Sequence, residues 1–247
     1  MKNKATQDGA LVLPSTLHPD LLLGELSKHQ PWGHKIDFSN GVSTAQLERR
    51  VPFSEFPIRK LRKVSTHIPF ERLRGGRLLD IGCNSGHNSI HAAVEYGMRT
   101  VGIDVTERHM QVARFLAELA GVECEFMLEN AETFLRPEAF DVVLHFGTLY
   151  HLPNPLLSLQ NSYANLKPGG YLALETQTYD HPEYPDACYF MHMQNNDPTN
   201  FWAISEHVLR RYLQLLGYES VDTLSRVAPA RLPQYQYRTL LVARKPA

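Results

Sequence analysis

A glycine-bearing turn between two apolar strands constrains this chain more than any other feature. The turn follows the apolar run 78–81, contains Gly82 and Gly86, and leads into a helix start. A second run, 98–104, ends on Asp104. Glycines let a ligand approach the backbone closely, because a Cβ atom would obstruct it. Nucleotide-binding sheets hold ribose hydroxyls with an acid about 20 residues past such a turn, so the segment predicts a nucleoside-containing cofactor.

The glycine turn taken alone leaves an alternative open. A dinucleotide fingerprint has three glycines, and Asn84 stands at the middle position here. An ordinary β-α turn therefore remains an interpretation of this segment. Asp80, at the end of the first strand, could likewise serve only as the N-cap of the following helix instead of contacting a ligand. A phosphate-binding loop is excluded, because no lysine follows the turn at the required spacing.

From Arg77 onward, strands and helices alternate along the chain. Such alternation predicts an α/β protein with a doubly wound, mostly parallel seven-stranded sheet. The last two strands have no helix between them, so we expect one of them to run antiparallel at the edge. The expected strands are 78–81, 98–104, 123–128, 140–146, 171–175, 218–224 and 238–243, and the expected helices are 107–120, 155–165 and 205–216.

Two segments stand apart from the alternating pattern. Residues 1–65 form an N-terminal cap with an amphipathic helix at 19–26 and a tight-turn signal at Asn40 and Gly41. Residues 66–247 form the sheet domain. Within it, the connection 178–203 is far longer than usual, which favours a lid or binding loop.

Composition limits the compartment and the kind of partner. The chain has 247 residues, 43% of them hydrophobic, with no apolar run long enough to span a membrane. Residues 1–4 lead into polar sequence without a signal-peptide core. Three widely spaced cysteines suit a reducing compartment and argue against structural zinc. We expect a cytoplasmic protein without a metal; the sequence leaves its oligomeric state open.

The charge balance bears on the substrate. The formal net charge is −1, whereas nucleic-acid enzymes usually carry a basic face. The basic cluster 59–63 is interpreted as the solvated face of a helix. This composition favours a small-molecule substrate over a polynucleotide.

Over roughly residues 70–247 the order of segments resembles the class I S-adenosylmethionine-dependent methyltransferases. Five segments carry the resemblance: the turn 79–86, the acid segment 102–104, the segment 129–132, the strand start 140–143 and the turn 166–170. The resemblance implies a Rossmann-like methyltransferase fold and S-adenosylmethionine as the cofactor.

The resemblance also implies roles for individual residues. Asp104 would accept both ribose hydroxyls, Gly82, Asn84 and Gly86 would lie against the methionine part, and Asp80 would pair with its amino group directly or through water. Asn130 would offer its side-chain carbonyl to the adenine amino group. The remaining expected cofactor contacts are a backbone N–H of Ala131 or Glu132 and the side chain of Phe146.

A finer resemblance is to the tRNA wobble-uridine methyl- and carboxymethyltransferases. It rests on the segments 146–152, 200–202 and 237–246. In the carboxymethyl members of that group, a tyrosine and an arginine hold the extra carboxylate of a carboxylated cofactor. The matching positions here are Tyr150 and Arg238, which we expect to bind substrate.

Methyl transfer to a neutral oxygen or nitrogen benefits from a general base, most often histidine. Candidates are His145 and His151, which flank the end of the fourth strand, and His192 in the lid. The lid also carries Tyr189 and Trp202, expected to contact the substrate. His87 and His91 have metal-binding spacing on one helix, but no acid of an HExxH motif lies between them, and metal binding is not favoured.

The sequence thus predicts a methyltransferase that acts on an oxygen or nitrogen of a small metabolite. The first alternative is a tRNA wobble-uridine modifier, with tRNA as the partner. The second is a catalytically silent protein that binds S-adenosylmethionine. No membrane partner is expected.

Overall fold

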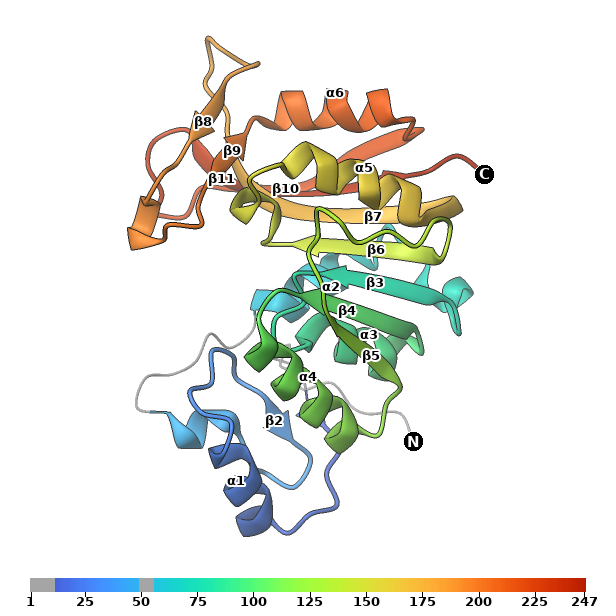
Figure 1. The fold of residues 1–247 in the computed structure, drawn as a ribbon, viewed down its shortest axis with the longest axis vertical. Helices are drawn as coiled ribbons and strands as arrows, with labels where there is room; N and C mark the ends of the chain where they lie inside the picture. Colours follow the sequence, from blue (N-terminus) through green and yellow to red (C-terminus); the bar gives the residue numbers. More distant parts are fainter. Residues whose placement is uncertain (1–11, 49–55) are drawn as a thin grey trace.

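A seven-stranded sheet forms the centre of the molecule in a computed structural model that describes residues 12–48 and 56–247 (Figure 1). Its strand order is β10-β11-β7-β6-β3-β4-β5. The five strands from β7 to β5 run parallel, and β11 is antiparallel to both neighbours. The strands are β3 (Arg77–Ile81), β4 (Arg99–Asp104), β5 (Cys124–Leu128), β6 (Phe140–Phe146), β7 (Leu166–Tyr179), β10 (Ser220–Val227) and β11 (Gln236–Arg244). The predicted doubly wound, mostly parallel sheet is confirmed.

The antiparallel strand differs in position from the expectation. Strand β11 lies between β10 and β7, and the edge strand is β10. After β10 the chain turns back, and β11 pairs with β7 along Gln236–Arg244. This pairing covers the edge of β7, so the last strand of the chain is an interior strand.

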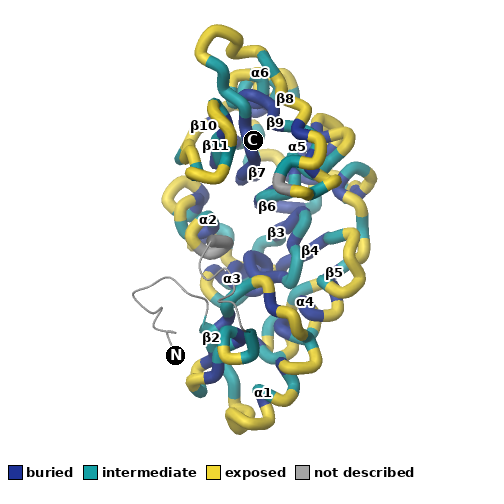
Figure 2. Tube along the Cα trace, turned by 90° about the vertical axis from the view of Figure 1, so that its left-hand side faces the viewer, coloured by how far each residue is buried: buried dark blue, intermediate teal, exposed yellow. Residues whose placement is uncertain are grey.

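Helices cover both faces of the sheet. Leu79 and Val143 pack with Leu159 of α5, whereas the neighbouring Leu78 and Val142 belong to the cluster on the opposite face. This alternation follows from the two-residue period of a strand. One face carries α2 (Phe56–Val64), α3 (His87–Tyr96) and α4 (Glu107–Ala120), and the other carries α5 (Pro155–Asn165) and α6 (Glu206–Leu216). The buried residues therefore follow the central strands, with exposed ones outside (Figure 2).

The N-terminal cap packs against α3 and α4. Trp32 of the cap shares one buried cluster with Ile90 of α3 and Met110 of α4, and its indole N–H donates to the Leu26 carbonyl. The cap contains β1 (Val12–Leu13), α1 (Pro19–Ser27), β2 (Asp37–Phe38) and the short helix η1 (Thr44–Leu47). Residues 1–11 and 49–55 of the predicted cap segment lie outside the described residues.

The predicted lid contains a small hairpin rather than only loop. Strand β7 runs on to Tyr179, and the hairpin pairs β8 (Cys188–Phe190) with β9 (Trp202–Ile204), with the turn η4 (Gln194–Asn196) between them. The lid is attached to the short helix η3 (Leu149–His151), because the Phe201 N–H donates to the Tyr150 carbonyl at 2.9 Å. None of the described helices is both long and apolar enough to cross a membrane.

Candidate functional site

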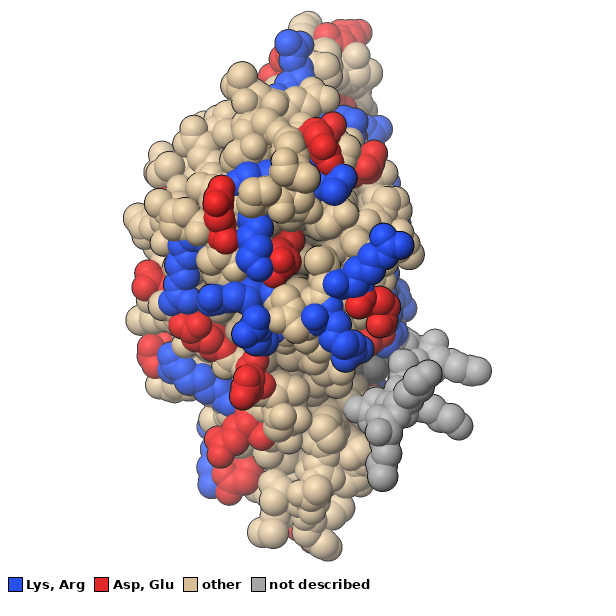
Figure 3. Space-filling view, turned by 90° about the vertical axis from the view of Figure 1, so that its right-hand side faces the viewer, with Lys and Arg blue, Asp and Glu red and all other residues tan. Residues whose placement is uncertain are grey.

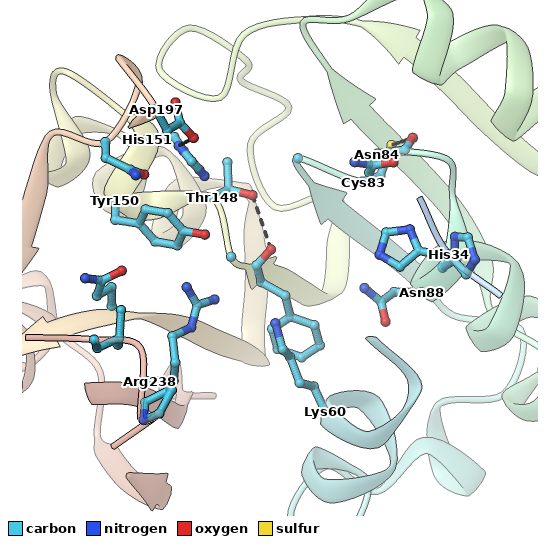
Figure 4. A pocket seen from close by; sticks show the side chains of 18 of the residues that line it. His34, Lys60, Cys83, Asn84, Asn88, Thr148, Tyr150, His151, Asp197 and Arg238 are labelled. Carbon is cyan, nitrogen blue, oxygen red and sulfur yellow. Dashed lines mark hydrogen bonds and ion pairs between the residues drawn. The ribbon is translucent and has the colours of Figure 1, made fainter. Parts of the chain in front are cut away.

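A cavity of about 760 Å³ opens at the carboxyl ends of the parallel strands. One end is formed by the turn after β3, which contributes Gly82, Cys83 and Asn84. The other end lies under the lid and is lined by Tyr150, His151, Gln177, Asn200 and Arg238. Figure 4 shows Cys83 and Asn84 on one side of the cavity and Tyr150, His151 and Arg238 on the other. Ligands of open α/β sheets bind at this edge.

The turn after β3 is held in a left-handed conformation. Gly82, Asn84 and Gly86 have φ values of 66°, 50° and 76°. Glycine adopts such values without strain, and asparagine tolerates them better than most residues. A Cβ atom on Gly82 would lie 2.0 Å from the Thr148 hydroxyl oxygen, so the loop after β6 packs directly on this glycine.

Asp104 at the end of β4 is fixed beside the turn. Its Oδ2 accepts from the Asn84 N–H at 3.1 Å, and its Oδ1 accepts from the Thr106 N–H at 3.0 Å. The His109 ring nitrogen Nδ1 lies 3.2 Å from Oδ1. Burial opposes ionisation of Asp104, but these partners outweigh burial and lower its pKa. The structure therefore holds an oriented carboxylate where the sequence predicts the ribose acid.

Two apolar side chains flank this carboxylate. Val105 is 68% exposed and Leu128, at the end of the neighbouring β5, is 50% exposed. The next segment forms a turn in which the Glu132 N–H donates to the Asn130 side-chain oxygen at 2.8 Å. The sequence predicted that the backbone N–H of Ala131 or Glu132 contacts the cofactor. The Glu132 N–H already donates within the protein, whereas the Ala131 N–H has no acceptor among the described residues. Apolar surface beside an acid suits a purine nucleoside.

Asp80 lies behind the turn and does not line the cavity. It is 1% exposed, and its Oδ2 accepts from the Ser89 hydroxyl at 2.7 Å. Burial raises the pKa of Asp80 to about 7. The structure thus brings Gly82 and Asn84 to the cavity surface but leaves Asp80 one layer deeper.

Three charged side chains form a buried cluster around Glu175, in the second half of β7. Glu175 accepts from Arg238 Nε at 2.6 Å and Nη2 at 2.7 Å, and from Lys60 Nζ at 2.6 Å. Their side chains are 4%, 17% and 15% exposed. Burial opposes ionisation of Glu175, but the two cations together lower its pKa. The expectation that the basic cluster 59–63 is a solvated helix face is therefore wrong for Lys60, which turns inward from α2.

Tyr150 and His151 lie at the lid end beside this cluster. The Tyr150 ring centre is 4.8 Å from the Arg238 guanidinium carbon, within cation–π range. His151 Nδ1 is 2.9 Å from the Thr199 hydroxyl and 3.3 Å from the Thr199 carbonyl, which can only accept. This pattern places the proton of a neutral His151 on Nδ1 and leaves Nε2 as the basic nitrogen. Burial lowers the pKa of His151, partly offset by Asp197.

Of the residues predicted for catalysis or for substrate binding, four lie outside the cavity lining. His145 is fully buried against Ser158 of α5, and burial lowers its pKa to about 3. His192 is exposed on the lid and stacks on Phe190. Tyr189 contacts the ring of Tyr179, and the Trp202 indole donates to the Pro153 carbonyl at 3.2 Å. Among the three predicted bases, only His151 faces the cavity.

Several cavity residues were not predicted from the sequence. His34 comes from the cap and lies 4.5 Å from the His87 ring, and Asn88 lies beside them (Figure 4). Burial keeps the pKa of His87 well below its usual value. The carboxyl-end rule would have found Glu175, which closes the strand predicted at 171–175. Across residues 12–48 and 56–247, no three His, Cys, Asp or Glu side chains are arranged to hold a metal ion.

Comparison with known proteins defines the class. Residues 52–223 match the sequence family described as a methyltransferase domain. The chain therefore belongs to the methyltransferase-domain family. The turn, the oriented Asp104 and the apolar residues beside it are features that binding of S-adenosylmethionine would require.

Two curated relatives match different parts of the chain. The tRNA U34 carboxymethyltransferase of Desulfotalea psychrophila is 30% identical over 185 residues, which cover 70% of this chain and 57% of the relative. The ubiquinone biosynthesis O-methyltransferase of Ruegeria pomeroyi is 40% identical over 110 residues, which cover 44% of this chain and 43% of the relative. The chain thus spans about half the length of these relatives.

Solved structures support the fold. The N-terminal domain of EvdMO1 with S-adenosylhomocysteine bound has a TM-score of 0.70 at 17% identity, with 93% of this chain and 98% of that chain covered. A putative methyltransferase from Bacillus halodurans has a TM-score of 0.60 at 22% identity, with 76% of this chain and 99% of that chain covered. At these identities the likeness concerns the fold alone.

Proposed function

We propose that the protein methylates an oxygen or nitrogen atom of a small-molecule acceptor, with His151 as the general base. The observation that carries the proposal is the two-ended cavity, whose glycine-turn end adjoins Asp104 and whose lid end contains a neutral imidazole. A volume of about 760 Å³ is in the range of small-molecule sites.

The chemistry follows from the groups present. When bound, S-adenosylmethionine supplies an electrophilic methyl group on a sulfonium. Gly82, Asn84 and Asp104 would hold the cofactor, and the lid end would hold the acceptor. His151 Nε2 would take the proton that the acceptor atom loses as its new bond to carbon forms. Holding the two reactants in line supplies much of the rate.

Two arguments support a small acceptor over a polynucleotide. The cap contributes His34 to the cavity lining and the lid contributes Asp197 and Asn200, so the acceptor end is a recess that suits a compact molecule. The chain also has a formal net charge of −1, and Lys and Arg side chains lie among Asp and Glu side chains on the face shown in Figure 3. Nucleic-acid binding depends on neutralising many phosphates with a basic surface.

The second candidate function, a tRNA wobble-uridine carboxymethyltransferase, is favoured by a specific observation. Tyr150 and Arg238, the positions matched to that group, lie together in the cavity with Lys60. Lys60 and Arg238 bind Glu175, which occupies part of their hydrogen-bonding capacity. We therefore keep this function as the alternative.

One experiment separates the candidates. The enzyme is incubated with methyl-labelled S-adenosylmethionine and cell extract divided into RNA and small-molecule fractions. Label in small molecules is the expected result, and label in RNA would support the tRNA alternative. Cofactor binding without label in either fraction would identify a silent binding protein. The variant His151→Gln should retain S-adenosylhomocysteine affinity within twofold and lose at least tenfold in kcat.

A further inference from the structure

Two histidine rings at the glycine-turn end of the cavity have no role in the proposed reaction. His34 comes from the cap and His87 from the first turn of α3, and their ring centroids are 4.5 Å apart. We propose that this imidazole pair takes up a proton from solvent as the cofactor binds, and that the protonated pair holds the carboxylate of the cofactor's methionine end. The inference rests on the proposed function, because it takes S-adenosylmethionine as the cofactor. It makes the binding step depend on pH.

The imidazole pair lies on the side of the cavity that the glycine turn forms. Both rings line the cavity, as do Asn84 of the turn and Asn88 of α3. In Figure 4, His34 and Asn88 lie on the same side as Asn84, across the cavity from the lid end. Asp104, the proposed ribose ligand, accepts from the Asn84 N–H, so Asp104 and this wall flank the same turn. The wall is therefore assigned to the amino-acid end of the cofactor, and the lid end to the acceptor.

His87 and Asn88 carry buried polar atoms without partners. His87 is 5% exposed, and neither of its ring nitrogens has a hydrogen-bond partner in the described part of the chain. Asn88 is 9% exposed, and its Oδ1 also lacks a partner there. Such burial is unfavourable unless a ligand completes it. An α-amino acid can do so, because its carboxylate accepts from an imidazole N–H and its ammonium group donates to an amide oxygen.

The N-terminus of α3 favours an anion at the same place. The helix begins at His87, and its N-cap residue, Gly86, has no side chain to cap the first N–H groups. The N-terminus of a helix attracts negative charge. Asp80 accepts from the Ser89 hydroxyl one layer below and does not reach the cavity. Asn88 therefore replaces Asp80 as the group that faces the ammonium end of the cofactor.

The imidazole pair is neutral before the cofactor binds. Burial lowers the pKa of His34, and the charges of Lys60 on α2 and His109 on α4 lower it further. Burial also holds the pKa of His87 well below its usual value, and His34 and His91 act in the same direction. All these groups oppose protonation of the pair, so it has a proton to gain at neutral pH.

A carboxylate beside the pair reverses this balance. An opposite charge stabilises the imidazolium form and raises its pKa, and the raised value belongs to the two rings together. Cofactor affinity is then full below the pKa of the unliganded pair and is lost as pH rises through the pKa of the bound pair. The neighbouring charged groups already have partners: Lys60 bonds to Glu175, His109 to Asp104 and His91 to Glu95.

The first test is calorimetry of the full chain with S-adenosylhomocysteine. Titrations at about pH 7 in phosphate and in Tris count the protons exchanged, because the two buffers differ in ionisation enthalpy. We expect an uptake of about 0.5 to 1 proton per molecule bound, and a Kd that rises at least about fivefold between about pH 6 and pH 8. 5′-Methylthioadenosine has the same nucleoside and sulfur but lacks the amino-acid end, and should bind without uptake.

Each result of this test decides between the inference and the proposed function. Asp80→Asn is measured beside the wild type, because Asp80 could release a proton that masks the uptake. Binding of S-adenosylhomocysteine without uptake in both proteins would overturn the inference and leave the proposed function standing. Equal uptake with 5′-methylthioadenosine would assign the proton to the nucleoside end and overturn it as well. No binding of S-adenosylhomocysteine would overturn the proposed function and the inference with it.

The second test uses variants of the two histidines. His34→Gln should abolish the uptake and weaken S-adenosylhomocysteine binding about tenfold, while 5′-methylthioadenosine binding changes less than about twofold. His18→Gln, which removes an imidazole of the same cap that is 69% exposed, is the matched control and should change neither value.

His87→Leu separates ligand binding from packing. The ring nitrogens of His87 have no partner in the described chain, so an apolar side chain of similar size should not lower the thermal midpoint. Its affinity for S-adenosylhomocysteine should nevertheless fall about tenfold. A lowered midpoint with unchanged affinity, or equal losses of affinity for S-adenosylhomocysteine and 5′-methylthioadenosine, would show that the pair is only structural and overturn the inference.

Discussion

At the scale of single residues, Gly82 combines two separate constraints. Its φ of 66° strains any other residue, and the Thr148 hydroxyl occupies the position of a Cβ atom. We predict that Gly82→Ala destabilises the protein by about 2–4 kcal/mol and weakens cofactor binding, because overpacking adds to backbone strain. Urea denaturation and calorimetry with S-adenosylhomocysteine measure the two effects.

Gly121→Ala is the matched control for this prediction. Gly121 has a φ of 63°, but nothing lies within 4 Å of a Cβ atom built on it. Its substitution therefore reports backbone strain alone, expected at about 1 kcal/mol. If both variants lose the same stability, the packing of Thr148 on Gly82 has no energetic role.

Asp80 should make stability depend on pH. Burial raises its pKa from 3.8 to about 7 in the folded protein, so the carboxyl is protonated when the chain folds at acidic pH. The contribution is fully present below about pH 4 and is lost as pH rises through 7. We predict that Asp80→Asn stabilises the protein relative to wild type at pH 8, by up to about 4 kcal/mol, and much less at pH 5. Thermal unfolding at both pH values measures this, and an equal shift at the two would refute it.

His151 should impose an acid limb on the reaction rate. A base acts in its neutral form, and burial lowers the pKa of His151 below 6.5. The rate should therefore be constant near neutral pH and fall as pH drops through that lowered pKa. The measurement is the pH profile of kcat, with His151→Gln as the comparison. An identical acid limb in the variant would assign the titration to another group.

At the scale of elements, the cap packs against α3 and α4 of the sheet domain. Arg108 of α4 donates to the carbonyls of His29 and Pro31, next to Trp32. We predict that Trp32→Ala lowers the free energy of unfolding by about 3–5 kcal/mol, because Trp32 is 6% exposed in the shared cluster. It should also weaken cofactor binding, since His34 reaches the cavity from the same segment.

Leu21→Ala, at a position 64% exposed on α1, is the control and should stay within about 0.5 kcal/mol of wild type. If Trp32→Ala alters stability as little as this control does, the cap does not depend on that contact.

The sequence predicted most elements because their signals are local. Hydrophobic period, glycine turns and connection lengths predicted α4, α5 and the strands of the parallel part of the sheet, but not their order in it. The place of β11 was missed, because pairing of distant strands leaves no local signal. The same reason explains which residues of the site the sequence revealed and which it did not. Gly82 and Asp104 were readable along the chain, whereas Lys60 and Glu175 are 115 residues apart and meet only in the fold. The sequence predicted that the lid aromatics contact the substrate, whereas in the structure Tyr189 contacts Tyr179, and Trp202 contacts Phe190 and Pro153.

At the scale of the whole molecule, the charge distribution predicts weak tRNA binding. The formal net charge is −1, and the positive charge of the cavity lies inside the molecule. We expect the slope of log K against log salt for unfractionated tRNA to be shallower than about −2, which corresponds to roughly two phosphate contacts. Filter binding between 50 and 200 mM salt, about a fourfold range, measures the slope. A slope of about −6 or steeper would favour the tRNA alternative.

The most direct measurement is a crystal structure of the full chain with S-adenosylhomocysteine. We predict that both ribose hydroxyls lie within hydrogen-bond distance of Asp104, that the adenine lies between Val105 and Leu128, and that the sulfur faces the lid end of the cavity beside Gly147. A nucleoside bound elsewhere, or a ribose held by groups other than Asp104, would contradict this account of the site.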